Sequence, residues 1–178
     1  TTTEQVKAFT SDGFTVGDNS DANHYVNVNN SNYIAWLWKA GGSGSSNSDG
    51  AQTTTVSANT TAGFSIVTLT GTGSSTTYGH GLGTTPKVLI LKSRSGTDNW
   101  YFFSTAADGT TDYYYINTTA AKTDSSGIFP SSSTFSTSYT NGTTIVAYCF
   151  AEIEGYSNFS TYLGDGTGGT FVYTGFKP

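Results

Sequence analysis

The sequence predicts an all-β protein, an antiparallel β-sandwich of jelly-roll type. About half of its residues are Ser, Thr, Gly or Asn, which are poor formers of helix interiors. Aromatic residues make up 15% of the chain, whereas only 11% of residues are charged. The apolar residues gather in short bursts bounded by Gly, Asn, Asp and Ser clusters, as is typical of sandwiches and barrels. Because each large aromatic side chain buries roughly 150–250 Å², the chain has enough apolar material for a core.

The expected strands follow these apolar bursts. Ile34, Trp36 and Trp38 share one face of an extended segment, because side chains on a strand alternate with a period of two. The run 88–91 is continuously apolar, as expected of a central strand covered on both sides. At most one helical turn is expected, at 4–9. The strands are expected at 14–16, 25–28, 33–39, 64–70, 87–93, 100–104, 112–117, 134–138, 144–151, 157–163 and 170–174.

The Gly/Ser-rich segment GGSGSSNSDG at 41–50 lies between an N-terminal part and the main body of the chain. Gly/Ser runs behave as flexible coil, so this segment is either a linker or a long surface loop within one domain. The sandwich domain is expected over 51–178. Residues 1–40 are expected to form N-terminal strands that pack on this main body or on a neighbouring subunit.

The sequence also contains an internal strand-pattern repeat. The segment 33–40 resembles 145–152, and each is followed by a glycine-aromatic pair and then by a Gly-rich turn. Pro178 of the second copy stands where Pro86 precedes the apolar run of the first. Short β-repeats pair to complete a core, so the chain is expected to be a fragment or to exchange a strand between subunits. The alternative is a chance likeness between strand patterns.

Charge and composition exclude several classes of partner. The net charge is −5 and only seven residues are Lys or Arg, whereas binding to nucleic acid needs clustered basic residues. No stretch approaches the roughly 20 apolar residues of a membrane-spanning helix. Cys149 is the only cysteine and lies in an apolar run, so it is expected to be a buried apolar side chain. We therefore expect neither nucleic acid nor membrane as a partner.

No residue pattern predicts an enzyme, a cofactor or a regular metal site. The oxygens of Asp18, Asn19 and Asp21 leave open an irregular calcium site, since the spacing of an EF-hand loop is absent. His24 and His80 are far from each other and from Cys149, so no zinc spacing exists. His80 lies in a glycine-flanked turn and is expected to bond a carbonyl group there. On a strand, Glu152 and Glu154 would lie roughly 6.5–7 Å apart, within the ~5–9.5 Å that glycosidases use. The third acid that sandwich-type retaining enzymes carry on that strand is missing, so the two glutamates are expected to be solvated.

The aromatic residues provide a candidate glycan-binding site at Trp100, Tyr113 and Tyr115. Aromatic faces flanked by Asn, Asp and hydroxyl groups suit sugar rings, which have apolar C–H faces and polar rims. Alternation places Tyr113 and Tyr115 on one face and Tyr114 on the other. The competing interpretation is that one face packs in the core and the other in a contact between subunits.

Six stretches carry a resemblance to a known family. They are FTSDGFTVG at 9–17, YIAWLWKAGGSGSSN at 33–47, TVSANTTAGFSIVTLTGTG at 55–73, YGHGLGTTPKVLILKSRS at 78–95, VAYCFAEIEGYS at 146–157 and FVYTGFKP at 171–178. With these motifs the chain resembles virion-associated structural proteins, of the tail-fibre or surface type, from marine tailed phages and aquatic metagenomes.

The resemblance implies a non-enzymatic virion protein, a tail fibre or a decoration of the capsid or tail surface. Such a protein assembles in multiple copies, contacts itself and other virion proteins, and is made in the host cytoplasm before it reaches the virion surface. A lone cysteine agrees with folding in that reducing compartment. Two alternatives stay open: a carbohydrate-binding module that attaches to host surface glycans, and a subunit of a bacterial extracellular fibre.

Overall fold

The computed structural model describes residues 6–17, 26–106, 108–125, 128 and 130–176 of the chain. Twelve strands and no helix occur in these residues. The chain divides into two compact units, Thr1–Leu37 and Trp38–Pro178. Each unit is described by itself below.

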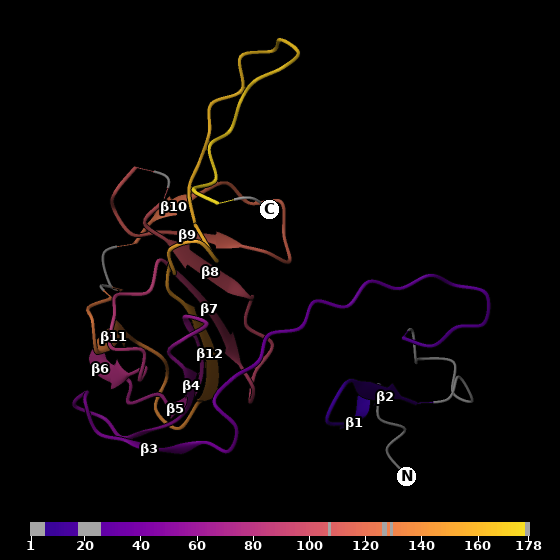
Figure 1. Cartoon of the computed structure of the whole chain (residues 1–178). Coiled ribbons are helices and arrows are strands. Elements are labelled where there is room, and N and C mark those ends of the chain that lie inside the picture. The colour runs from indigo at the N-terminus through magenta and orange to yellow at the C-terminus, as the bar shows by residue number, and fades with distance from the viewer. Residues whose placement is uncertain (1–5, 18–25, 107, 126–127, 129, 177–178) are drawn as a thin grey trace. The chain divides into compact units, whose positions relative to one another are not determined.

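The N-terminal unit contains one β-hairpin (Figure 1). Strands β1 (Val6–Phe9) and β2 (Phe14–Val16) pair antiparallel, and the turn closes through a 2.9 Å hydrogen bond from the Thr10 amide to the Gly13 carbonyl. The helical turn expected at 4–9 is therefore wrong for its described part. The strand expected at 33–39 is absent, and 26–28, the described part of the strand expected at 25–28, also lies outside any strand.

The second unit is built around one large antiparallel sheet. Its eight strands lie in the order β10-β9-β8-β7-β12-β5-β4-β3. The strands of this unit are β3 (Ser45–Asn47), β4 (Thr54–Asn59), β5 (Phe64–Thr70), β6 (Thr76–Gly79), β7 (Val88–Ser93), β8 (Tyr101–Ser104), β9 (Asp112–Tyr115), β10 (Thr123–Asp124), β11 (Thr134–Thr137) and β12 (Thr144–Phe150).

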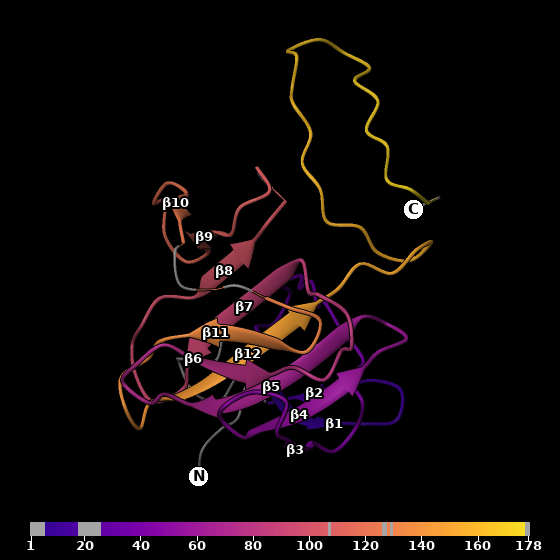
Figure 2. The same ribbon diagram turned by 90° about the vertical axis from the view of Figure 1, so that its left-hand side faces the viewer.

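A second, two-stranded sheet of β11 and β6 lies over one face of the large sheet (Figure 2). We call the covered face the inner face. Its core contains Val67, Leu91, Ile145 and Cys149 of the large sheet, packed with Tyr78 and Phe135 of the small one. Two facing sheets with apolar residues between them form a sandwich-like fold, so the expected all-β class is confirmed.

The opposite face of the large sheet, the outer face, carries a row of apolar side chains. Strand register places Ile66, Tyr148, Ile90, Phe102 and Tyr114 side by side across five strands. All five are half-buried. The neighbouring row of Phe64, Phe150 and Val88 is buried, and the Trp38 ring packs on it at 5.5 Å from Phe150. We call the half-buried set the apolar row.

The segment 41–50 belongs partly to the large sheet. Its residues 45–47 form β3, which pairs with β4 at the end of the sheet. Gly41 lies against the backbone of Ala58, where a Cβ atom would come within 2.1 Å of the carbonyl oxygen. The Gly/Ser composition here therefore permits close backbone approach as well as turning.

The C-terminal segment 158–176, which we call the arm, begins on the outer face with residues 158–161, its root, and then projects away from both sheets (Figures 1 and 2). The strands expected at 157–163 and 170–174 are absent, because a strand needs a hydrogen-bonded neighbour and neither segment pairs as one. The two copies of the sequence repeat accordingly differ in structure. Residues 144–150 form β12, whereas 33–37 lie in no strand.

The core position of Phe135 gives a stability prediction. Its side chain is 0% exposed and its ring lies 6.0 Å from that of Tyr78. We expect Phe135→Ala to lower the free energy of unfolding by about 3–5 kcal/mol, measured by denaturant unfolding of the full chain. Phe171→Ala is the matched control, since this arm residue is 84% exposed. Equal effects of the two substitutions would contradict the described core.

Candidate functional site

The structure brings together two residues of the candidate glycan site, Tyr113 and Tyr115, and places Trp100 apart from them. Tyr113 and Tyr115 lie on the inner face of β9, with ring centroids 5.4 Å apart. Trp100 directly precedes β8 and is exposed, and its amide donates to the Asn117 side chain at 3.0 Å. No ring contact between Trp100 and either tyrosine occurs in the described part of the chain.

An aromatic groove opens between the two sheets beside Tyr113. It has a volume of about 380 Å³. Tyr101 forms its centre, since this ring lies 5.6 Å from Tyr113 and 6.5 Å from Tyr139. The lining residues are Ser75, Asp98, Tyr101, Phe103, Tyr113, Ser125, Ile128, Thr137, Ser138, Tyr139 and Thr140. We call this hollow the tyrosine groove; neither Trp100 nor Tyr115 lines it.

The tyrosine groove combines aromatic walls with hydroxyl groups and one carboxylate. Burial raises the pKa of Tyr139, and the negative charges of nearby groups act in the same direction, so its phenol stays protonated at neutral pH. Protonated phenols and the Asp98 carboxylate supply donors and acceptors beside apolar ring faces, the combination that sugar-binding sites use. Sequence reasoning missed Asp98 and Tyr139 because neither lies in the strand that carries Tyr113.

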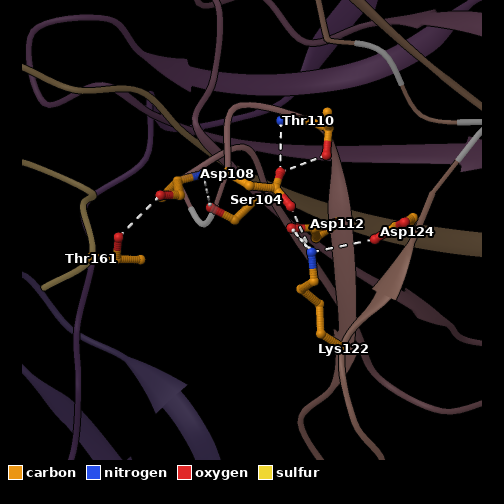
Figure 3. A network of polar contacts seen from close by, with 8 residues as sticks. Ser104, Asp108, Thr110, Asp112, Lys122, Asp124 and Thr161 are labelled. Atoms are coloured by element: carbon orange, nitrogen blue, oxygen red, sulfur yellow. Dashed lines mark hydrogen bonds and ion pairs between the residues drawn. The ribbon is translucent and has the colours of Figure 1, made fainter. Parts of the chain in front are cut away.

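A lysine joins three carboxylates at the end of β9 (Figure 3). The Lys122 amino group lies 2.7 Å from Asp108, 2.9 Å from Asp112 and 3.3 Å from Asp124. The hydrogen bond between Lys122 and Asp108 lowers the pKa of Asp108 from its ordinary value. The same bond, together with that to Asp112, raises the pKa of Lys122 from its own ordinary value. Asp112 and Asp124 face each other across the β9–β10 pair. Like charges so placed repel, and Lys122 offsets this.

This lysine–aspartate cluster is an ion-pair network centred on Lys122. Among the described residues, its three carboxylates form the one acidic group whose oxygens all lie within 4.8 Å of one another, as a metal site would need. The Lys122 amino group already lies among them and supplies the positive charge. Asp112 is fully buried and one of its oxygens has no hydrogen-bond partner, so it depends on Lys122 for compensation.

His80 is a fully buried link between two loops. Its Nδ1 accepts a hydrogen bond from the Leu82 amide at 3.2 Å, and its Nε2 lies 3.2 Å from the Ser131 carbonyl. Since Nδ1 accepts, Nε2 carries the proton and donates to Ser131, which defines a neutral imidazole. Burial lowers the pKa of His80, against smaller opposing effects of Ser131 and Asp49. The other histidine, His24, lies outside the described residues.

Three further side chains that the sequence singles out, Cys149, Glu152 and Glu154, lie in the described part of the second unit. Cys149 is fully buried, and burial raises the pKa of its thiol to about 12. A thiol in such surroundings is a poor nucleophile. Glu152 and Glu154 are exposed, and Glu152 accepts a hydrogen bond from the Phe159 amide at 3.1 Å. Asp18, Asn19 and Asp21, a candidate calcium-binding group by composition, lie outside the described residues.

A second hollow lies on the outer face where the arm begins. Its volume is about 560 Å³. The lining residues are Val88, Phe102, Ser104, Ala106, Tyr114, Ile116, Asn158, Phe159, Ser160 and Thr161. We call it the outer groove. Two members of the apolar row form part of it, so the groove and the row are continuous.

The fold and these sites define an all-β, sandwich-like protein with an aromatic groove between its sheets and a projecting arm. A family model described as a domain of unknown function, DUF7483, matches residues 1–178, and the chain belongs to this family. No curated protein matches the chain, and no solved structure does. The described residues include no helix that is long and apolar enough to cross a membrane.

The buried His80 gives a prediction for the pH dependence of stability. Because its pKa is lower in the folded state than the ordinary 6.5, the unfolded chain binds more protons below that pH. We therefore expect the contribution of His80 to stability to be complete above pH 6.5 and to decrease as the pH falls. A single proton gives a slope of at most about 1.4 kcal/mol per pH unit.

Denaturant unfolding between pH 8 and pH 5 measures this dependence. His80→Gln should flatten the curve, because the amide does not titrate, whereas His24→Gln is the control for the other histidine. Two results would refute the role of His80. One is a free energy of unfolding of the parent chain that does not change across this pH range, and the other is an equal flattening of the curve by His80→Gln and His24→Gln.

Proposed function

We propose that the chain is a non-enzymatic structural protein of a phage virion, a tail fibre or a decoration of the capsid or tail surface. Made in the host cytoplasm, it assembles in multiple copies on the outside of the particle, where it contacts itself and other virion proteins. The six sequence stretches that resemble such proteins support this proposal. Nucleic acid and membrane are not proposed as partners, since the net charge is −5 and apolar helical spans are lacking in the described residues.

One observation carries the proposal: extended segments of the chain present large apolar side chains to solvent. In the arm, Leu163 is 90% exposed and Phe171 is 84% exposed. In the N-terminal unit, Ile34 is 87% exposed and Trp36 is 80% exposed. Contiguous exposed apolar groups mark contact surfaces. A chain whose work is assembly with further subunits accounts for them.

The remainder of the fold supports the same proposal. The large sheet has a closed core without any disulfide bond, and its lone thiol at Cys149 is buried and protonated. Its stability therefore does not depend on the redox state of the compartment. A subunit made in a reducing cytoplasm and later released into an oxidising medium needs this property.

Purified particles test the proposal. We expect antibodies raised against the chain to label the surface of tailed phage particles in electron micrographs, and mass spectrometry of those particles to count several copies per particle. Labelled open filaments that lack a capsid would favour the alternative, a subunit of a bacterial extracellular fibre. Absence from both particles and filaments would refute both proposals.

A second candidate function is attachment to host glycans, which the tyrosine groove favours. Its volume of about 380 Å³ admits a small saccharide, and three tyrosines and Asp98 line it. Stacking of a sugar on a tyrosine ring and hydrogen bonds from its hydroxyl groups to Asp98 are the interactions that this groove offers. A virion surface protein and a glycan-binding module are compatible functions of one chain.

Glycan arrays and calorimetric titration test this candidate. We expect Tyr113→Ala to weaken binding of a captured glycan at least tenfold, and Asp98→Asn, at an exposed position, to weaken it without unfolding the chain. Trp100→Ala is the matched control, because Trp100 is exposed but does not line the groove. No glycan bound by the parent chain, or a loss with Trp100→Ala alone, would contradict the groove as the site.

A further inference from the structure

We infer that the arm of one copy docks on the outer face of a second copy of the chain. This inference rests on the proposed assembly in multiple copies, and it names the surfaces that meet. The docking segment is 162–173 of the arm. Its receiving surface is the apolar row, together with the outer groove that continues it.

The receiving surface is a continuous strip of apolar side chains that are only half-buried. The apolar row crosses five adjacent strands without interruption, and each of its members is half-buried. On the inner face, by contrast, the corresponding rows are closed by the small sheet, and Leu91 and Ala147 are fully buried. The outer face therefore holds a continuous apolar strip that the described residues of the second unit cover only in part.

The root of the arm shows how arm residues bind this face. The Phe159 ring packs beside the buried row, 6.1 Å from Phe150. Its amide is fixed by Glu152, and the Thr161 hydroxyl donates to the Ala106 carbonyl at 3.4 Å. Residues 158–161 also line the outer groove. The following part of the arm projects away from the sheets (Figures 1 and 2), and its next apolar side chains, Tyr162 and Leu163, are exposed.

The projecting part of the arm matches the apolar row in chemistry. Tyr162, Leu163, Phe171 and Tyr173 are all exposed. Asp165 is the one charged residue among 158–176. It lies at the tip, where its carboxylate accepts hydrogen bonds from Thr167 and Thr170. No member of the apolar row is charged either, so docking buries apolar area without removing an ion from water.

A second copy is the occupant that these observations favour. The arm leaves its own body at Thr161, while its own root and Trp38 already fill the neighbouring buried row. The strip that remains is continuous with the root of the arm through Phe102 and Tyr114. If each arm docks on the other copy, both contacts are the same, which is the geometry of a closed two-fold assembly.

Light scattering during size-exclusion chromatography of the full chain tests the inference. We expect the parent chain to form a dimer or a larger assembly. The variant Tyr162→Ser, Leu163→Ser and Phe171→Ser should raise its dissociation constant at least tenfold. The variant Phe9→Ser and Tyr156→Ser is the matched control, because these side chains are 79% and 62% exposed and belong neither to the docking segment nor to its receiving surface. Loss of assembly with this control alone would overturn the inference.

Disulfide trapping locates the contact. A tagged chain carrying Leu163→Cys is mixed with an untagged chain carrying Ile90→Cys, and the mixture is oxidised. We expect a mixed disulfide between the two chains. Ser132→Cys is the control acceptor, since this exposed residue precedes β11 on the side of the inner face. The native Cys149 is buried and does not compete.

Each further outcome separates this inference from the proposed function. If particles carry several copies but no mixed disulfide forms, the docking is refuted and the virion proposal stands. If Leu163→Cys and Ile90→Cys in one dilute chain crosslink within that chain, the arm covers its own face and the inference fails. A parent chain that remains monomeric at high concentration also overturns it, whatever the particles contain.

Discussion

The position of β12 is the constraint on which the rest of the second unit depends. This strand pairs with β5 on one side and with β7 on the other, and it is the only element joining β3–β5 to β7–β10 within the described large sheet. Its inner side chains Ile145, Ala147 and Cys149 are fully buried. Because β12 is the last strand along the chain, the sheet is complete only when residues 144–150 enter it, which makes the fold depend on long-range pairing.

The two faces of that sheet have different roles as a result. The small sheet and its loops close the inner face, and the aromatic residues left over at its margin form the tyrosine groove. Among the described residues of the second unit, Trp38, Ala40 and the root of the arm pack on the outer face, and an apolar strip beside them is half-buried. This apolar surface and the apolar arm, neither of which is covered by the described residues of the second unit, are the physical basis of the assembly that we propose.

Ionisable groups serve structure in this unit. Lys122 offsets repulsion between facing aspartates, His80 joins two loops as a neutral imidazole, and Cys149 packs as an apolar residue. In each case the surroundings favour one protonation state at neutral pH. Groups held in this way stabilise the arrangement of the chain around them.

The sequence by itself determined the all-β class and the best-packed strands. The alternation in 64–70 and the apolar run at 88–91 fix these segments as strands, because both of their sides must be covered. The strand prediction from sequence was wrong in two ways: it missed some strands and it predicted others that do not form. β4 and β6, rich in Thr and Ser, were not predicted, whereas 33–39, 157–163 and 170–174 were predicted but are not strands. A sequence pattern indicates only that a segment is suited to pair with another strand. Only the tertiary structure decides which neighbours exist, since backbone hydrogen bonds and the meeting of Tyr113 with Asp98 and Tyr139 depend on distant parts of the chain.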